Sequence, residues 1–222
     1  MGTASREARW IGEHTQEAQA TALVRIFVLA MATRQLSLIA WYRINDLEPA
    51  QEVIGHDNNR HLGIRRPPDQ VKPAAQAFVE LRRLFAQPFR ILNVPVTIVE
   101  RQGSEPEVRA FQLQDGRYVV AAWMGNGSTR GSSVAGQPID DQRRAVVRVD
   151  LRVESEGMEL MDGLGRRLDK SRVTEKPGNR DRQLHFELRG GELLLLVGRP
   201  ASRGRPGITA RTPPHGGVTQ MW

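Results

Sequence analysis

Cysteine is absent from this chain of 222 residues, which excludes disulfide bonds, thiolate catalysis and cysteine-ligated zinc. Long apolar runs are missing as well, and none approaches the roughly 20 residues needed to cross a bilayer. The opening residues, MGTASREARW, contain no apolar core of a secretory signal. We therefore expect no membrane-spanning segment and no signal peptide, and the sequence leaves the cellular location open.

Lysine is rare, because only three of the 32 basic residues are lysines and the rest are arginines. The net charge of +7 and the isoelectric point of about 10.8 would suit a nucleic-acid-binding protein. Such a protein needs its basic residues gathered in a stripe or patch, whereas here they are scattered and many have acidic neighbours. Arginine excess also follows from a GC-rich coding sequence. Nucleic acid is therefore not expected as a partner and remains a distant alternative.

The first part of the chain has the pattern of a parallel α/β fold. Residues 15–33 carry apolar side chains at helical spacing. Residues 36–42, LSLIAWY, are apolar with almost no alternation, which predicts a strand covered on both faces. A second helix is predicted from Lys72-Pro73, since proline in the first helical turn costs no hydrogen bond. Helix, buried strand and helix follow one another in parallel α/β folds.

A long connection, residues 43–71, follows the predicted strand. Connections of this length without regular structure are uncommon and often functional, and α/β proteins bind ligands beyond the carboxyl ends of their strands. His56, Asp57 and His61 lie in this connection and could together ligate a metal. A polar loop at the rim of a ligand cleft is the simpler interpretation, so we expect neither a metal nor a cofactor.

From residue 88 the chain changes to short runs that are β-branched or alternate between apolar and polar residues. Turn signals such as Asp115-Gly116 and Gly190-Gly191 separate them. Strands at this spacing predict an antiparallel β-sandwich of roughly seven or eight strands. After residue 200 the chain is rich in Gly, Pro and Arg without periodicity, which predicts disorder. The sequence thus predicts three parts: residues 1–87, the sandwich at 88–200 and a disordered tail at 201–222.

The order of these parts resembles the C-terminal end of a retaining glycoside hydrolase with a (β/α)8 barrel and an appended β-sandwich. The likeness is to the group of β-xylosidases, α-L-iduronidases and cellulase-like enzymes, whose last helix, strand and helix carry motifs of the form QA…R, WY…D and GL…KPA. The matching residues are Gln19-Ala20, Arg25, Trp41-Tyr42, Asp46, Gly63-Ile64 and Lys72-Pro73-Ala74, followed in the sandwich by Asp115-Gly116, Trp123, residues 161–165 and Pro200. The implied fold class is α/β plus all-β: the last helix–strand–helix unit of a TIM barrel followed by an antiparallel β-sandwich.

The resemblance also implies a carbohydrate ligand, an oligo- or polysaccharide. Aromatic residues are only 5% of the chain, yet two of them end the predicted strand, where enzymes of this group stack a sugar ring. The polar residues that follow could hydrogen-bond sugar hydroxyls or, in the case of the arginine and the aspartate, pair with each other. Neighbouring residues of a strand face opposite sides, so one of these two aromatic side chains would be buried in the barrel packing and could not contact a sugar. The expected substrate-binding residues are Trp41, Tyr42, Arg43, Asn45 and Asp46.

The catalytic pair of such enzymes is not found in the sequence. Retaining hydrolysis uses two carboxylates about 5 Å apart, which in the resembling group are glutamates at the ends of the fourth and seventh barrel strands. Glu7, Glu13 and Glu17 lie in or just before the first predicted helix and suit the positive end of its dipole. We therefore expect no catalytic residue, no activity of this chain alone and an upstream polypeptide as the partner that completes the barrel. Whether the chain is an enzyme stays open.

A non-catalytic β-sandwich that binds carbohydrate or a partner chain is the alternative. Exposure of Trp123 and Tyr118 on one sandwich face would favour such a module. Burial of Trp123 would favour a hydrolase fragment. The sequence identifies neither the sugar nor the linkage.

Overall fold

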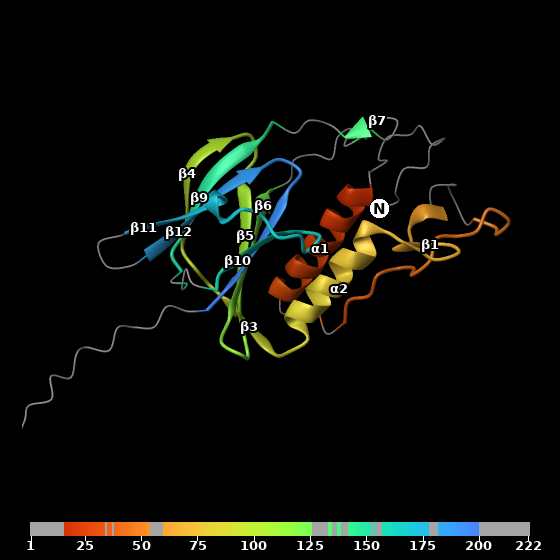
Figure 1. Ribbon diagram of the computed structural model, residues 1–222, viewed down its shortest axis with the longest axis horizontal. Helices are drawn as coiled ribbons and strands as arrows, with labels where there is room; N and C mark the ends of the chain where they lie inside the picture. The colour runs from red at the N-terminus through yellow and green to blue at the C-terminus, as the bar shows by residue number, and fades with distance from the viewer. Residues whose placement is uncertain are drawn as a thin grey trace, which may run out of the picture.

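The computed structural model describes residues 16–33, 35–36, 38–53, 60–125, 133–134, 137–138, 142–151, 153, 157–177 and 182–199. These residues form three layers: a pair of helices, a five-stranded sheet and a four-stranded sheet (Figure 1). The helices cover one face of the five-stranded sheet, and its other face packs on the four-stranded sheet. The expected tail at 201–222 lies outside the described residues, so its disorder stays a prediction.

The two helices lie side by side and run in the same direction (Figure 1). Helix α1 spans Gln16–Thr33 and helix α2 spans Pro73–Phe85, with Pro73 in the first turn. Both expected helices are confirmed. Among the described helices, none is long and apolar enough to cross a membrane. Because the helices are parallel, the chain must return over the length of the pair between them, which accounts for the long connection at 34–72.

Nine strands make up the two large sheets, and every neighbouring pair is antiparallel. The five-stranded sheet contains, in spatial order, β10 (Glu159–Asp162), β13 (Leu193–Gly198), β6 (Tyr118–Met124), β5 (Pro106–Leu113) and β3 (Phe89–Leu92). The four-stranded sheet contains β11 (Val173–Pro177), β12 (Arg182–Arg189), β9 (Arg144–Val149) and β4 (Val96–Gln102). The expected antiparallel sandwich is confirmed.

Several short elements were not visible in the sequence. They are the hairpin strands β1 (Arg65–Arg66) and β2 (Gln70–Val71), the pair β7 (Ser133–Val134) and β8 (Gln137–Pro138), and the 3-10 helix η2 (Lys170–Arg172). Strand β11 was missed too, because its sequence, VTEKP, is charged and ends in proline. Proline is tolerated at an edge of a sheet, and β11 is an edge strand.

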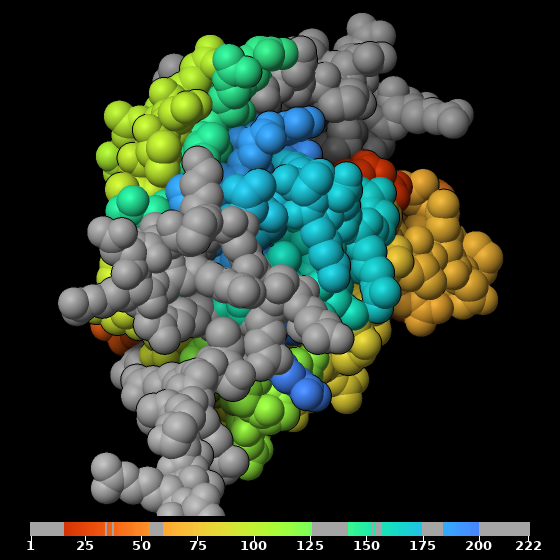
Figure 2. Space-filling model, turned by 60° about the vertical axis from the view of Figure 1, so that its left-hand side comes forward, coloured from red at the N-terminus to blue at the C-terminus, as the bar shows by residue number. Residues whose placement is uncertain are grey.

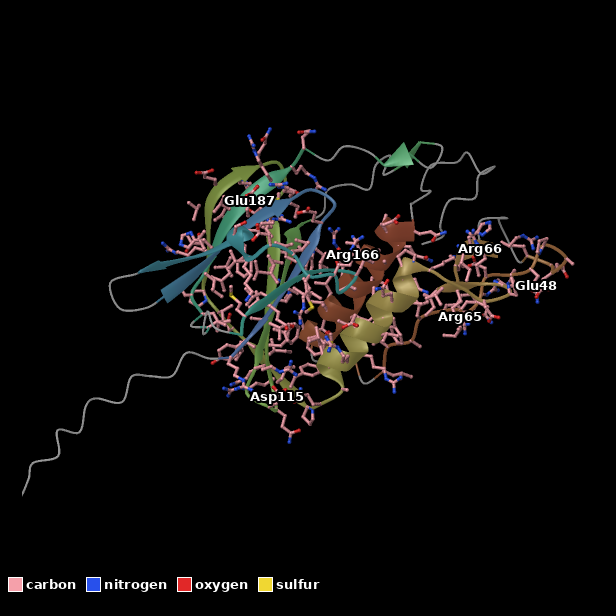
Figure 3. The ribbon with its side chains drawn as sticks, viewed as in Figure 1. Glu48, Arg65, Arg66, Asp115, Arg166 and Glu187 are labelled. Carbon is pink, nitrogen blue, oxygen red and sulfur yellow. The ribbon has the colours of Figure 1, made fainter. Side chains whose placement is uncertain are left out.

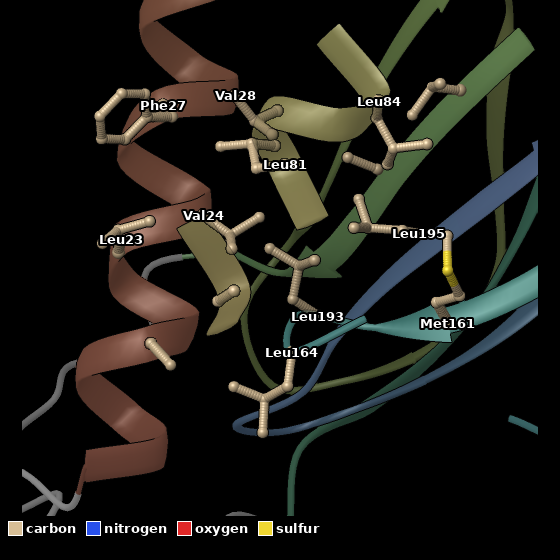
Figure 4. Close-up of a cluster of buried hydrophobic side chains, with 14 of the residues drawn as sticks. Leu23, Val24, Phe27, Val28, Leu81, Leu84, Met161, Leu164, Leu193 and Leu195 are labelled. Atoms are coloured by element: carbon tan, nitrogen blue, oxygen red, sulfur yellow. The ribbon is translucent and has the colours of Figure 1, made fainter. Parts of the chain in front are cut away.

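Two hydrophobic clusters hold the layers together. One fills the space between the sheets and includes Val147 and Phe186. The other lies between the helices and the five-stranded sheet, where Leu23, Leu81 and Leu193 are all less than a tenth exposed (Figure 4). This second core includes side chains from both sides of residue 88. The sequence also predicts that the sandwich at 88–200 folds as a self-contained unit and that residues 1–86 are the weaker half. This stays a prediction, and the structure adds that the two parts share a core.

The strand predicted at residues 36–42 is not found at 36 and 38–42, the residues of this range that the structure describes. No described strand pairs with this segment, and the first pairing after it is a single parallel bridge at Asn45. Trp41 packs on the helix-side core, whereas Leu36 and Leu38 are 59% and 81% exposed. A strand needs a neighbour to pair with its backbone N–H and C=O groups, so an apolar run alone does not make one. The two helices of the expected barrel unit are present, and the barrel unit itself is not confirmed.

The turn at residues 161–165, MDGLG, connects the sandwich to the helix layer. Asp162 Oδ1 accepts hydrogen bonds from the backbone N–H groups of Leu164 and Arg166, both at 2.9 Å. Gly165 has φ of +80°, and a Cβ there would lie 2.4 Å from Cγ of Glu80 on α2. Glycine is required both for the turn and for its close approach to the helix.

Candidate functional site

The connection between α1 and α2 forms a projection from the side of the helix layer. The structure describes residues 35–36, 38–53 and 60–72 of this connection. In Figure 1 residues 45–53 and 60–70 lie beyond the helices, on the side away from the sheets, and in Figure 2 they stand out at the edge of the molecule. Glu48, Arg65 and Arg66 lie within it (Figure 3). All five residues expected to bind substrate belong to this connection.

A buried ion pair ties the projection to the start of α2. Lys72 precedes the first residue of α2, and its Nζ donates to Oδ1 of Asp46 at 2.7 Å. The same Nζ donates to the backbone oxygens of His61 and Gly63 at 3.1 and 2.9 Å. The side chains of the pair are only 1% and 2% exposed. An ammonium has three N–H donors, and these three bonds join Lys72 to three points of the connection.

The other carboxylate oxygen of Asp46 faces His61 and Arg66. His61 Nδ1 and Arg66 Nε each lie 3.8 Å from Oδ2, within ion-pair range but beyond hydrogen-bonding distance. Among the described residues, none hydrogen-bonds this oxygen. Burial alone would raise the pKa of Asp46, but His61 and Lys72 outweigh burial and hold the pKa below its usual range. Burial also lowers the pKa of Lys72, which the Asp46 carboxylate offsets only in part.

Further contacts fix the chain around Gly63. Trp41 Nε1 donates to the backbone oxygen of Leu62, and Gln19 Nε2 on α1 donates to that of Gly63, both at 3.3 Å. A Cβ on Gly63 would lie 2.3 Å from backbone atoms of residues 45–46, so only glycine fits. Residues from all three barrel-like sequence motifs therefore meet in one network. They are Gln19, Trp41, Asp46, Gly63 and Lys72.

The structure separates the five expected ligand residues into two sets. Trp41 and Asp46 face inward and belong to the network around Gly63. Tyr42 is 71% exposed, Asn45 is exposed and Arg43 is half-buried. The Arg43 guanidinium lies 5.3 Å from the centroid of the Tyr42 ring, and its Nη2 donates to the Tyr42 hydroxyl at 3.2 Å. A polar, aromatic surface is thus left at Tyr42, Arg43 and Asn45.

Acid should weaken the fold partly through Asp46. Its folded-state pKa is below the unfolded value of about 3.9, so the stabilisation is complete above that value and is lost as pH falls through the folded pKa. We expect the urea midpoint of the wild type to fall as the pH is lowered below about 4, and the fall to be shallower in Asp46→Asn. Asp69→Asn is the control, since the Asp69 side chain is 88% exposed. Parallel pH profiles of Asp46→Asn and wild type would contradict this role.

The structure supports no metal ligand set within the ranges it describes. No group of three or more His, Asp or Glu side chains there could hold an ion. His56 and Asp57, the other two candidate ligands in the sequence, lie outside the described residues. His61 is instead directed at Asp46.

Trp123 is a core residue. It is only 3% exposed, and the Arg25 guanidinium on α1 lies 6.0 Å from its ring centroid. Arg25 also donates to the backbone oxygen of Glu192 at 3.1 Å, which joins α1 to the turn before β13. Tyr118, at the other end of β6, packs half-buried against the core between the sheets. These two residues do not form an exposed aromatic face.

The sequence predicts a helix start at Lys72 but does not predict its pairing with Asp46. One signal was available, because Lys72 stands at the N-cap of α2, where the helix dipole disfavours a positive charge. A cation in that place suggests a buried anion nearby. The sequence does not identify Asp46 as this anion, because 26 positions separate it from Lys72.

A solved structure of a larger protein shares the fold of this chain. It is a family 39 glycoside hydrolase from the gut symbiont Bacteroides cellulosilyticus WH2, with a TM-score of 0.54 and 17% sequence identity. The likeness covers 81% of this chain and 30% of that one. No family model and no curated protein matches the sequence. The chain thus has a fold similar to part of a glycoside hydrolase and spans under a third of that protein's length.

Proposed function

We propose that this chain is a glycoside hydrolase-like protein that supplies carbohydrate-binding groups and does not hydrolyse on its own. In this proposal residues 1–87 correspond to the last unit of a (β/α)8 barrel, and residues 88–200 to its accessory sandwich. The similarity in fold to part of a family 39 glycoside hydrolase supports it. The order of two parallel helices with residues 41–46, WYRIND, between them also supports it.

The observation that carries the proposal is the exposed apolar side of residues 38–44. Leu38, Tyr42 and Ile44 are 81%, 71% and 56% exposed, while Ile39 and Trp41, between them, pack on the core. This near alternation is that of a strand with one covered face, although no described strand lies beside it. Neighbouring strands of a barrel, from a polypeptide upstream, would cover Leu38 and Ile44 and leave Tyr42 open to a ligand.

The surface proposed to contact carbohydrate consists of Tyr42, Arg43 and Asn45. The exposed tyrosine ring offers an apolar face to a sugar ring, and the arginine and asparagine offer hydrogen-bonding groups to hydroxyls. Asp46 serves this surface indirectly, because its ion pair with Lys72 fixes the chain that follows. Hydrolysis would require two carboxylates about 5 Å apart, and the proposal assigns neither to this chain.

The test is a titration of the purified chain with xylotriose, followed by backbone amide shifts in NMR. We expect residues 42–45 to respond and Tyr42→Ala to abolish their response. Leu38→Ala is the matched control, since Leu38 is exposed in the same segment and carries no polar group. We expect no release of nitrophenol from aryl-xylosides, aryl-glucosides or aryl-iduronides. Turnover by this chain alone, or a response of residues 42–45 that is unchanged in Tyr42→Ala, would show that the proposal is wrong.

A carbohydrate-binding sandwich without any barrel partner remains the alternative. Trp123 is buried, so such a module could not use this tryptophan as an exposed platform for a sugar ring. Light scattering distinguishes the two, because an uncovered apolar segment at 38–44 favours self-association. A monomer at all concentrations would favour the independent module.

A further inference from the structure

A shallow hollow of about 470 Å³ lies on the sandwich, on the outer face of the four-stranded sheet. Seven residues of β4, β9 and β12 line it: Glu100, Arg101, Gln102, Arg144, Ala145, Val146 and Glu187. Its volume is within the roughly 300–1,000 Å³ of small-molecule sites. Glu187 and Arg66 lie at opposite sides of the molecule in Figure 3, so the hollow is separate from the projection.

The pairing of β4, β9 and β12 brings the polar side chains of the hollow close to one another. Glu100 on β4 and Glu187 on β12 both stand opposite Val146 of β9, which lies between them. Neighbouring strands are about 4.8 Å apart, so the backbones that carry the two glutamates are separated by about 10 Å. Two positions along β9, Arg144 stands opposite Gln102 and donates from Nε to its Oε1 at 3.0 Å. Four planar polar groups therefore surround an aliphatic floor.

These groups retain hydrogen-bonding capacity for a ligand. Glu100 makes no side-chain hydrogen bond or ion pair with any residue that the structure describes. One oxygen of Glu187 is held by Arg189 at about 3 Å, and no described residue bonds to the other. Arg144 donates from Nε to Gln102, and its two terminal nitrogens bond to no residue in the described ranges, so they remain donors there. Because all four side chains stand on strands, their positions depend little on loop motion.

We propose that this hollow binds one unit of a neutral saccharide. Planar carboxylate, amide and guanidinium groups can each form paired hydrogen bonds, which match the adjacent hydroxyls of a sugar ring. Val146 provides an aliphatic floor for the C–H face of the ring. The charges of the lining are balanced, with Glu100 and Glu187 beside Arg101 and Arg144, which suits an uncharged ligand. This proposal rests on the carbohydrate-binding function proposed above. It adds a second surface of the chain at which carbohydrate binds.

The binding should be weak, because no aromatic side chain lines the hollow and stacking is therefore missing. A titration of the full chain with xylotriose should shift backbone amides in β4, β9 and β12 with a Kd of roughly 1–10 mM. Glu100→Ala and Arg144→Ala should each weaken this binding by about three- to tenfold, as expected for the loss of one or two hydrogen bonds. Asp69→Ala, an exposed carboxylate on the projection, should leave the Kd unchanged.

Glucuronic acid is the second probe, and it should bind more weakly than a neutral monosaccharide such as xylose. The proposal is overturned if xylotriose causes no shifts in these three strands, if the two variants bind as wild type, or if glucuronic acid binds as tightly as xylose. The Tyr42→Ala variant distinguishes carbohydrate binding in the hollow from carbohydrate binding at residues 42–45. A response of the hollow that persists in this variant supports the second surface, even where residues 42–45 do not respond.

Discussion

Replacing Lys72 with methionine should lower the free energy of unfolding by about 3–5 kcal/mol, the usual cost of breaking a buried ion pair on one side. In Lys72→Met the Asp46 carboxylate would stay buried without the cation that hydrogen-bonds to it, and the backbone oxygens of His61 and Gly63 would lose their donor. For a chain of this size the loss corresponds to a fall in Tm of roughly 10 °C. Urea and thermal unfolding measure it directly.

Two further variants distinguish the ion pair from a general effect of losing a cation. Arg83→Met removes a side chain that is 66% exposed and pairs with Glu80 on the same helix, and it should cost less than about 1 kcal/mol. Asp46→Leu combined with Lys72→Met removes both charges and should recover about half of the loss, because apolar replacements of buried pairs are often neutral. A Lys72→Met protein as stable as Arg83→Met would contradict the role of the pair.

Phe111→Ala should destabilise the fold by about 3–5 kcal/mol, since it leaves a large cavity in a packed core. Phe111 is fully buried on β5, and its ring lies 5.2 Å from that of Phe85 on α2 and 5.7 Å from that of Phe89 on β3. Both contacts are edge-to-face, an arrangement that adds to simple burial. The substitution therefore weakens the junction between the helices and the sheet.

Circular dichroism and tryptophan fluorescence should lose their signals at the same, lower temperature in Phe111→Ala, because the helices and the five-stranded sheet share one core. Val79→Ala is the control on α2, where the side chain is 60% exposed; a change within about 0.5 kcal/mol is expected. Early loss of helix signal, with an unchanged strand transition, would contradict a single cooperative unit. It would support a boundary near residue 88.

Local patterns predicted most of the fold. The two helices followed from apolar spacing and from Pro73, and eight of the nine strands in the large sheets lie inside runs that alternate or are β-branched. The failure at residues 36–42 has a physical cause. An apolar run indicates burial, but pairing depends on a neighbouring strand, and no local pattern reports whether that neighbour exists.

The candidate site was predictable only in part. The sequence predicts that the cluster from Trp41 to Asp46 binds a ligand, and this stays a prediction. The division of the cluster into inward and outward side chains depends on contacts with distant segments. Lys72 and Gly63 approach this cluster only through the return of the connection to α2. Contacts between segments this far apart in the sequence depend on tertiary packing. Sequence spacing alone therefore could not tell which polar groups a ligand would reach.

The burial of Lys72 gives the protein a chemical reporter of local opening. Acylating reagents attack neutral, accessible amines, so they should modify exposed Lys170 readily and spare Lys72, which is 1% exposed. Because only three lysines compete for reagent, peptide mass mapping can assign each modification to its position. The rate at which Lys72 becomes labelled would then measure how often the connection detaches from α2, in the intact chain and without any substitution.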